Sequence, residues 1–264
     1  MPEGHKTHYL ASQHTKLFAG QQLKVSSPQG RFSSDARKVN GRALESVDAA
    51  GKHLFYVFEG ERIVHVHLGR YGSFVTEPSP PASAKGQVRM RVVGPEVTLD
   101  LRGPTQCRVI DEETRDSVID KLGPDPLAGG KRADFLANIS TSNRPIGGLL
   151  LDQSVVAGIG NILRAEILFE TGIDPNRAGK DLSPEEFTRL WRSLSKMMKV
   201  SLKHGRIISV TAKEAGKPLT KLADKERFRI YGKAECPRCG HAITQSPVAS
   251  RKLYACPQCQ NMVN

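Results

Sequence analysis

The chain begins Met1-Pro2-Glu3, which places an unusual pair of chemical groups at its end. Removal of Met1, which is usual when proline follows it, would leave a secondary amine beside a carboxylate. N-terminal amines form a minor class of enzymatic nucleophiles. Most chain ends are instead frayed or simply begin a strand. The position of Pro2 and Glu3 alone therefore favours the structural interpretation, and the rest of the chain must decide.

Four of the five cysteines form two C-x2-C pairs near the C-terminus, Cys236 with Cys239 and Cys256 with Cys259. This spacing is typical of four thiolates that bind zinc tetrahedrally, whereas a reducing cytosol disfavours disulfides. Four thiolates leave no coordination position for substrate or water, so we predict one structural Zn²⁺ per chain. Cys107 lies far upstream and is expected to be a small, buried apolar residue.

The composition indicates a polyanionic partner. Lys and Arg number 39 against 27 Asp and Glu, which gives a net charge of +12 and a pI of about 9.6. Nucleic acid is the first candidate and an anionic membrane surface the second, while an ordinary solvated basic surface remains open. No apolar run approaches the roughly 18 to 20 residues of a membrane span, and a stretch with His, Lys and Gln stands where a signal peptide would have its apolar region. A cytoplasmic monomer is expected.

Two kinds of periodicity divide the chain. Residues 23–109 form short, often alternating apolar runs with frequent turn residues, which predict a β-sandwich or barrel preceded by a helix over residues 4–19. The sequence LGPDPLAGGK stops regular structure near residues 125–131, and helical periods follow. The clearest helix is predicted to start after Ser183 as N-cap, with Pro184 in its first turn, and to end at Gly205.

Residues 145–172 carry a further signal. The pattern predicts an apolar helix that stops at Gln153, a turn that contains Gly158 and Gly160, and a second helix from Asn161. The free N–H groups at the start of a helix attract anions such as phosphate. From this segment alone, a plain helical hairpin with a glycine connection is the better interpretation.

Together, these motifs resemble one known family. M-P-E-G at the start, A-G-K-H-L-F at residues 50–55, L-D-Q-x4-G-I-G-N at residues 151–161 and R-x4-C-P-Q-C-Q at residues 251–260 are similar to the formamidopyrimidine-DNA glycosylase/endonuclease VIII family of base-excision repair. The motifs occur in order along the whole chain. The resemblance implies an α+β multidomain fold: a catalytic β-sandwich at 1–125, a linker at 126–131, a helix-two-turn-helix domain at 132–225 and a zinc-finger hairpin at 226–264.

The resemblance also implies the chemistry. Family members use the N-terminal proline as a nucleophile that forms an imine with C1′ of the damaged nucleotide, and the next glutamate handles protons. Pro2 and Glu3 match these positions, and Lys52 matches the motif lysine that approaches phosphate and assists catalysis. The cationic imine acidifies the C2′ proton, so strand cleavage by β- and then δ-elimination can follow base loss.

The same resemblance implies a set of DNA contacts. Gly160 and Asn161 match the phosphate-binding element, and Arg251 matches the arginine of the zinc-finger hairpin. Arg70 and Tyr71 lie on the loop where family members carry side chains that fill the gap left by a flipped base. Without the motifs, Lys52 and Arg251 would be ordinary surface charges and Tyr71 an ordinary turn residue.

Two departures bear on the substrate. The guanine-lesion branch usually carries an Arg-Phe pair where this chain has Gly103 and Pro104, which favours the endonuclease VIII branch and oxidised pyrimidines. Leu163 replaces a tyrosine that is frequent in the family. Two alternatives stay open: a damaged-DNA or abasic-site binding protein of the same fold without activity, and a zinc-ribbon RNA-binding protein, which would leave Pro2 and Glu3 unexplained.

Overall fold

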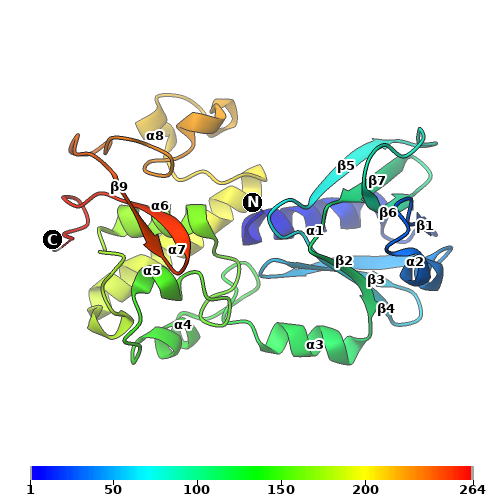
Figure 1. Ribbon diagram of the computed structural model, residues 1–264, viewed down its shortest axis with the longest axis horizontal. Helices are drawn as coiled ribbons and strands as arrows, with labels where there is room; N and C mark the ends of the chain where they lie inside the picture. Colours follow the sequence, from blue (N-terminus) through cyan, green and yellow to red (C-terminus); the bar gives the residue numbers. More distant parts are fainter. Residues whose placement is uncertain (1, 263–264) are drawn as a thin grey trace. The chain divides into compact units, whose positions relative to one another are not determined.

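The computed structural model describes residues 2–262. By their internal contacts, these residues form two compact units. Unit 1 comprises Pro2, Glu3 and Thr7–Asp120, and unit 2 comprises Gly4–Lys6 and the chain from Lys121 onward. The helix α1 (Gly4–Phe18) therefore contributes its first turn to unit 2 and its remainder to unit 1 (Figure 1).

Unit 1 contains two antiparallel four-stranded sheets, as the alternating apolar pattern predicted. Their strand orders are β2-β3-β4-β8 and β1-β6-β7-β5. The inward side chains of both sheets, among them Leu54, Val64, Met90 and Leu99, pack with Phe18 of α1 in one buried core. The strands are β1 (Lys24–Ser26), β2 (Leu44–Ala50), β3 (His53–Phe58), β4 (Arg62–His67), β5 (Ser73–Pro78), β6 (Val88–Val93), β7 (Val97–Arg102) and β8 (Gln106–Ile110).

Two short helices complete unit 1. The helix α2 (Ser33–Val39) interrupts the region predicted as strands. Only two of its seven residues, Ala36 and Val39, are buried. Two apolar positions are too few to show a helical period in the sequence, so the helix was not predicted. The helix α3 (Glu112–Asp120) follows β8, and its Val118 packs against a small cluster of Phe55, Ile63 and Ile110 on the second face of the β2-β3-β4-β8 sheet.

Unit 2 begins as a helical domain. Its helix α7 starts after Ser183, whose side-chain oxygen accepts from the N–H of Glu186, has Pro184 in its first turn and ends at Gly205 in the left-handed conformation, as predicted. The stripe from Phe187 to Met198 lies in the core, with Trp191 at its edge. The helices are α4 (Arg132–Ile139), α5 (Ile146–Leu149), α6 (Asn161–Thr171), α7 (Pro184–His204) and α8 (Ala212–Ala215), with 3-10 turns at Gly179–Asp181, Leu219–Lys221 and Asp224–Glu226.

The apolar helix predicted to reach Gln153 is much shorter in the structure. α5 ends at Leu149, and turns occupy the chain up to α6. Asp152 explains the early end, because its carboxylate accepts from both the backbone N–H and the hydroxyl of Ser154, at 3.1 and 2.7 Å. Such local side-chain bonds offer the backbone an alternative to the helix.

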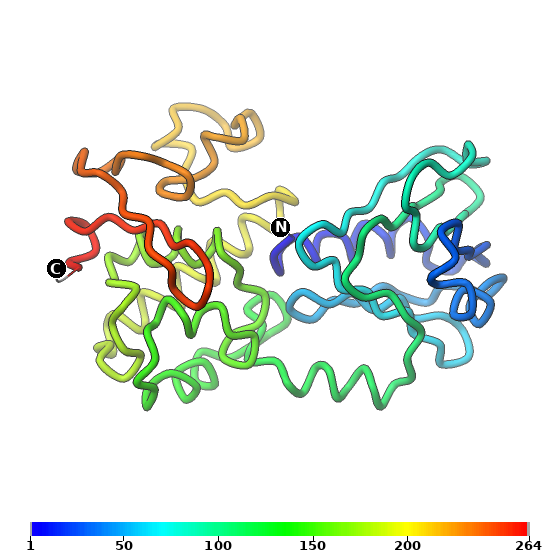
Figure 2. The backbone as a smooth tube through the Cα atoms, in the orientation of Figure 1, coloured from blue at the N-terminus to red at the C-terminus, as the bar shows by residue number. Residues whose placement is uncertain are grey.

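The C-terminal hairpin of β9 (Thr244–Val248) and β10 (Arg251–Ala255) completes unit 2. Its apolar side chains do not form a separate core. Ile243, Val248 and Leu253 pack instead with Ala165 and Phe169 of α6, so that β10 and α6 lie side by side (Figure 2). No helix within residues 2–262 is both long and apolar enough to cross a membrane.

Candidate functional site

The N-terminal residues are held by a close backbone contact. Pro2 is half-buried, and Glu3 is 1% exposed and precedes the first turn of α1 in an extended conformation. The N–H of Gly4 donates to the carbonyl of Gly158 at 2.8 Å. A Cβ on Gly4 would lie 2.6 Å from the Cα of Gly158, which is closer than real Cβ atoms approach, and Gly158 itself has φ +88°. Both glycines are therefore needed to fix the chain two residues after Pro2.

Lys52 lies in the two-residue turn between β2 and β3. Gly51 precedes it with φ +56°, a conformation that favours glycine, and Lys52 is half-buried. Its charge acts on two neighbours in unit 1. Burial and then the positive charge of Lys52 lower the pKa of His67. Lys52 also contributes, after burial and His67, to the lowered pKa of His53. Lys52 is thus placed by a tight turn among imidazoles.

Three histidines form a cluster that the sequence analysis did not single out. His53, His65 and His67 lie on paired strands β3 and β4, and Nδ1 of His53 lies 2.8 Å from Nε2 of His65. When the Gln106 amide is oriented with its oxygen toward Arg108, that oxygen also accepts from Nδ1–H of His65 at 3.1 Å. His65 then accepts from His53 through Nε2, and both imidazoles are neutral.

This cluster is expected to make stability depend on pH. The pKa of His53 is lowered to about 4, chiefly by burial and then by the charges of His67 and Lys52. The pKa of His65 is lowered to about 3, chiefly by burial and then by the charges of His53, Arg108 and His67. Below pH 6.5 these histidines become protonated in the unfolded chain but stay neutral in the folded chain. The free energy of unfolding should therefore fall between pH 6.5 and pH 4. Denaturant titrations should show this slope, and a shallower one in His65→Gln. Equal slopes would contradict the neutral assignment.

Asn161 opens α6 and connects it to the hairpin. Its side-chain N–H donates to the carbonyl of Lys252 at 2.9 Å, and its oxygen accepts from Arg164 at 2.5 Å. Gly160 is the N-cap in an extended conformation and is buried. The start of an eleven-residue helix is thereby held against the backbone of β10 within one compact unit.

Arg164 is a residue whose importance the sequence did not reveal. It is fully buried, and its guanidinium donates to the carbonyls of Gly147 and Val248, both at 3.1 Å, besides Asn161. Buried arginines are rare, because a charge must be satisfied when it leaves water. Arg164 thus connects α5, α6 and the hairpin. The apolar residues on both sides of it in the sequence were the available signal for its burial.

Arg251 is the first residue of β10 and is exposed. It pairs with Val248 across a two-residue turn in which both Ala249 and Ser250 have positive φ, +51° and +59°. Turns of this kind fit the twist of a hairpin but normally carry Asn and Gly, so the backbone is strained here. The fixed turn positions Arg251 on the same hairpin that Asn161 contacts.

Glu166 forms a second buried connection. Its carboxylate is fully buried and accepts from the backbone N–H groups of Arg229, Ile230 and Tyr231 and from the hydroxyl of Ser209, at 2.6 to 3.0 Å. One side chain of α6 thus satisfies three consecutive backbone donors in the segment that leads to the cysteines. The helix and the cysteine module share this anchor.

Replacing Glu166 with alanine should destabilise the protein by about 3 to 5 kcal/mol, because three backbone donors would lose a charged acceptor in a buried site. Denaturant unfolding measures this loss. Glu113→Ala, on the exposed side of α3, is the control and should leave the unfolding midpoint nearly unchanged. Similar midpoints for the two variants would mean that water replaces the carboxylate at little cost.

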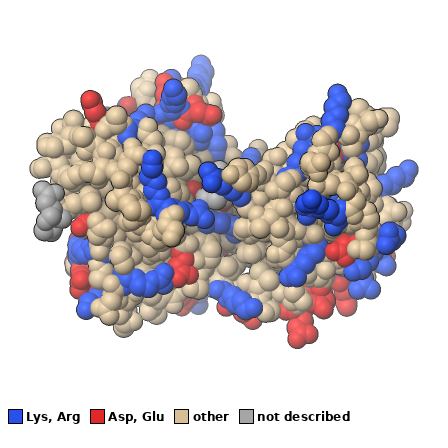
Figure 3. All heavy atoms as spheres, in the orientation of Figure 1, with Lys and Arg blue, Asp and Glu red and all other residues tan. Residues whose placement is uncertain are grey.

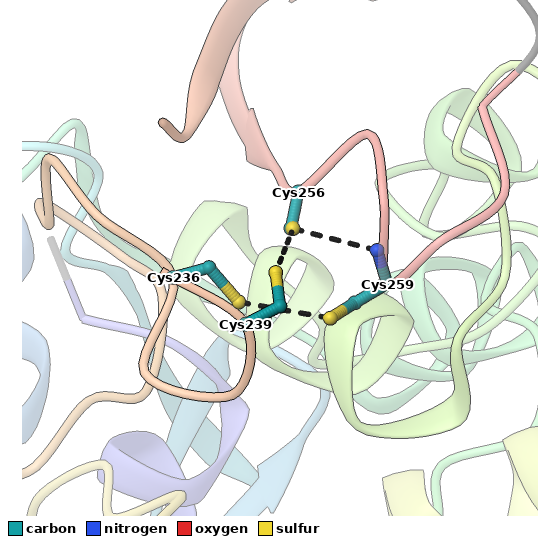
Figure 4. A group of neighbouring side chains, drawn as sticks. All are labelled: Cys236, Cys239, Cys256 and Cys259. Carbon is teal, nitrogen blue, oxygen red and sulfur yellow. Dashed lines mark hydrogen bonds between the residues drawn. The ribbon is translucent and has the colours of Figure 1, made fainter. Parts of the chain in front are cut away.

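The four cysteines converge on one point (Figure 4). Their sulfur atoms lie within 4.8 Å of one another, with 3.7 Å between Cys236 and Cys259 and 3.5 Å between Cys239 and Cys256. These distances are far too long for disulfides. They match the roughly 3.8 Å between thiolates bound tetrahedrally at about 2.3 Å from a metal. The cluster could therefore hold one metal ion.

The loop between β4 and β5 presents Arg70 and Tyr71 to solvent. Tyr71 is 77% exposed, the largest exposure among the exposed large hydrophobic side chains of the described residues, and the Arg70 guanidinium lies 5.3 Å from its ring centroid. The adjacent Gly72 packs against Leu68 so closely that a Cβ there would lie 2.3 Å from the Leu68 carbonyl oxygen. A close turn thus projects an aromatic side chain from unit 1.

Lys and Arg side chains also occur across the visible face of both units (Figure 3).

The predicted site residues fall into two groups. Lys52, Arg70 and Tyr71 belong to unit 1, with Pro2 and Glu3. Asn161, Gly160, Arg251 and the cysteines belong to unit 2, where direct contacts join Asn161 to the hairpin of Arg251.

Cys107 is only partly buried, packs at the edge of the unit 1 core, and has a pKa raised to about 12 by burial. It is a neutral thiol.

Comparisons with known proteins give a consistent result. The model of the formamidopyrimidine-DNA glycosylase N-terminal domain matches residues 1–110, and that of the formamidopyrimidine-DNA glycosylase H2TH domain matches residues 122–213. Endonuclease 8 1 of Mycobacterium tuberculosis is 44% identical over 98% of this chain and 100% of its own length. Formamidopyrimidine-DNA glycosylase of Thermus thermophilus is 31% identical over 92% of each chain.

Solved structures share the fold. Lactococcus lactis Fpg in complex with DNA containing N7-benzyl-Fapy-dG superimposes with a TM-score of 0.82 at 21% identity, over 99% of this chain and 100% of that one. The same protein in complex with abasic-site DNA gives a TM-score of 0.82 at 19% identity, over 98% and 100%. At such identities the likeness establishes the fold, and the predicted combination of β-sandwich, helical domain and cysteine hairpin is confirmed.

Proposed function

Because the chain belongs to the formamidopyrimidine-DNA glycosylase/endonuclease VIII family, we propose that it is a base-excision repair glycosylase that also cleaves the DNA strand. The observation that carries this proposal is the pair Pro2-Glu3, in which Glu3 is 1% exposed. A protein that only bound damaged DNA would need neither a free secondary amine nor a buried carboxylate beside it.

In the proposed reaction, the amine of Pro2 attacks C1′ of the damaged nucleotide once Met1 has been removed. The C1′–N bond to the base breaks, and the base leaves with a proton that Glu3 helps to deliver. Opening of the sugar gives a cationic imine, which acidifies the C2′ proton. Loss of that proton expels the 3′ phosphate by β-elimination, and a second elimination expels the 5′ phosphate.

Lys52 is proposed to assist this chemistry at a DNA phosphate. The Gly51 turn fixes its backbone, and the neutral histidines beside it add no competing positive charge at pH 7. The ammonium group of a lysine in this position can bind a phosphate oxygen as a compact positive charge. Arg70 and Tyr71 are proposed to enter the stack when the damaged base leaves it, since an exposed aromatic side chain on a fixed turn has the planar shape that a wedge requires.

In unit 2, the start of α6 and the β9–β10 hairpin are proposed to bind the phosphates beside the lesion. Gly160 is the N-cap of α6 and has no side chain, and the start of a helix attracts an anion through its dipole. Asn161 has a second amide hydrogen beyond the one given to Lys252. Arg251 contributes a guanidinium from the first position of β10, directly after the strained turn. The buried Arg164 connects α6 to the hairpin, and the buried Glu166 connects α6 to the segment that leads to the cysteines.

Replacing Arg251 with alanine should weaken DNA binding and lower its salt dependence. Each phosphate contact contributes about 0.9 to the slope of log K against log salt, so the slope should fall by about 1. Binding isotherms at several salt concentrations measure it, with Arg189→Ala on the exposed side of α7 as control. Equal slopes for Arg251→Ala and the original chain would remove Arg251 from the contacts.

The four cysteines are proposed to hold a structural Zn²⁺. Four thiolates suit zinc, and the sulfur distances fit it. When bound, the ion would supply folding energy to the hairpin and leave no position for substrate. The hairpin then presents Arg251, while the chemistry stays with Pro2, Glu3 and Lys52.

Oxidised pyrimidines are the proposed substrates. Gly103 and Pro104 stand where the guanine-lesion branch carries an Arg-Phe pair; Gly103 has φ +55° and no side chain, and Pro104 is buried. Neither can fill the space opposite a flipped base. Single-turnover excision from duplexes with an oxidised pyrimidine, 8-oxoguanine or an abasic site tests the proposal. Faster release of the pyrimidine supports it, and faster release of 8-oxoguanine would contradict the preference but not the enzyme class.

A further inference from the structure

One hollow on unit 1 has a basic lining that the proposed DNA repair chemistry does not use. It measures about 560 Å³, within the range of about 300 to 1,000 Å³ typical of small-molecule sites. Elements distant in sequence form it: α2 and the residues after it, the start of β4, and β8 with the first residues of α3. Its cationic residues are Arg37, Lys38, Arg42, Arg62 and Arg108.

The charges around this basic hollow are not balanced by the protein. Only Lys38 has an ion-pair partner, Asp35 at 2.7 Å; the four arginines make no ion pair with the described residues. One carboxylate, Asp111, lines the hollow, and it accepts the N–H of Thr114 at the start of α3. Five cationic side chains therefore converge beside only two carboxylates, Asp35 and Asp111, and like charges repel one another, so a bound polyanion would relieve an unfavourable arrangement.

Two of the guanidinium groups are held in place without being neutralised. Arg42 donates to the carbonyl oxygens of Lys38 and Glu59 at 2.8 and 3.1 Å. Arg108 donates to the oxygen of the reoriented Gln106 amide at 2.7 and 3.2 Å. Neutral acceptors fix the orientation and leave the full positive charge and further N–H donors for a ligand. Such preorganisation lowers the entropic cost of binding.

We propose that the basic hollow binds a compact oligophosphate, either inorganic tripolyphosphate or the triphosphate of a nucleotide. Arginine side chains match phosphate oxygens bidentately, and several of them around one hollow suit closely spaced phosphates. A DNA duplex presents its phosphates on a broad convex surface, which does not fit a concave site. The described residues that line the hollow include no aromatic side chain, so none of them offers a stacking surface that selects a base. Tripolyphosphate, ATP and GTP should therefore bind similarly.

Isothermal titration of the full chain with tripolyphosphate, ATP and GTP at low salt tests this proposal. The double variant Arg62→Gln/Arg108→Gln should lose at least about tenfold in affinity, since it removes two positive charges and their charge-assisted hydrogen bonds to phosphate. Arg189→Gln/Arg192→Gln, which removes the same charge from the exposed side of α7, should bind as the original chain does. Circular dichroism confirms that the variants fold, and Arg62→Lys/Arg108→Lys keeps the charge while removing the bidentate geometry.

Each result decides the question. Selective loss in the Arg62/Arg108 variants supports the site. Absence of binding by the original chain, or equal loss in both double variants, overturns it, because the second result means that net charge alone attracts the anion. Duplex DNA is titrated in parallel: if the Arg62/Arg108 variants lose affinity for duplex but tripolyphosphate does not bind, the hollow is a DNA contact instead. Excision activity plays no part in these outcomes.

Discussion

A chain with glycine in place of Pro2 is expected to lose base excision by at least about 1,000-fold while it binds abasic-site DNA with an affinity within about twofold of the original. Glycine offers a primary amine, whose imine must gain a proton before it becomes the cation that a secondary amine yields directly. Removal of a principal nucleophile typically costs several orders of magnitude in rate. Single-turnover excision and equilibrium binding on the same duplex separate the two effects.

A chain that retains Met1 is the complementary variant. An added residue converts the Pro2 amine into an amide, which has no nucleophilic lone pair, while the rest of the protein is unaltered. Intact mass establishes which form is present. Normal excision by the form with Met1 would exclude Pro2 as the nucleophile, and an equal loss of DNA affinity in the glycine variant would indicate that the terminus has only a binding role.

Loss of the metal site is expected to have the second large effect. Cys256→Ser should abolish stoichiometric zinc and weaken binding to abasic-site DNA by about 100-fold or more. Structural zinc in isolated finger peptides contributes about 10 to 16 kcal/mol, which is folding energy for the module. The hairpin has no apolar core apart from its packing on Ala165 and Phe169 of α6, and we expect this packing to be too small to keep Arg251 in position without the metal.

Metal analysis and DNA titration measure this effect, and Cys107 provides a matched control. Its pKa is raised to about 12 by burial and it lies in unit 1, so Cys107→Ser should keep both the metal and the DNA affinity. Retention of zinc by Cys256→Ser would contradict the four-cysteine site. Loss of zinc without loss of affinity would show that the hairpin folds on α6 without a metal.

Local signals made much of this fold predictable. The helix after Ser183 has a cap, a first-turn proline and a terminal glycine that act within a few residues, and the structure contains all three. The cysteine spacing likewise predicted their convergence. The short α2 escaped prediction because seven residues carry too little periodicity, and α5 was predicted too long because the Asp152 side-chain bonds that end it compete with an apolar pattern.

The interactions that position the candidate site were less visible in the sequence. Arg164 and Glu166 resemble surface charges in a helix, and only the fold brings to them the carbonyl and N–H groups that make their burial possible. The histidine cluster and the basic hollow require β3, β4 and β8 to be adjacent. Such sites join residues far apart in sequence, so no local pattern predicts them.

Borohydride trapping on duplexes with an abasic site or an oxidised pyrimidine tests the central proposal most directly. Reduction converts a transient imine into a stable bond, so the chain without Met1 should form a covalent adduct with DNA, and the Pro2→Gly chain should form far less at equal occupancy. Peptide mass analysis should place the adduct on Pro2. DNA binding without an adduct, or an adduct on a lysine that persists in the glycine variant, would contradict the proposal that Pro2 is the catalytic nucleophile.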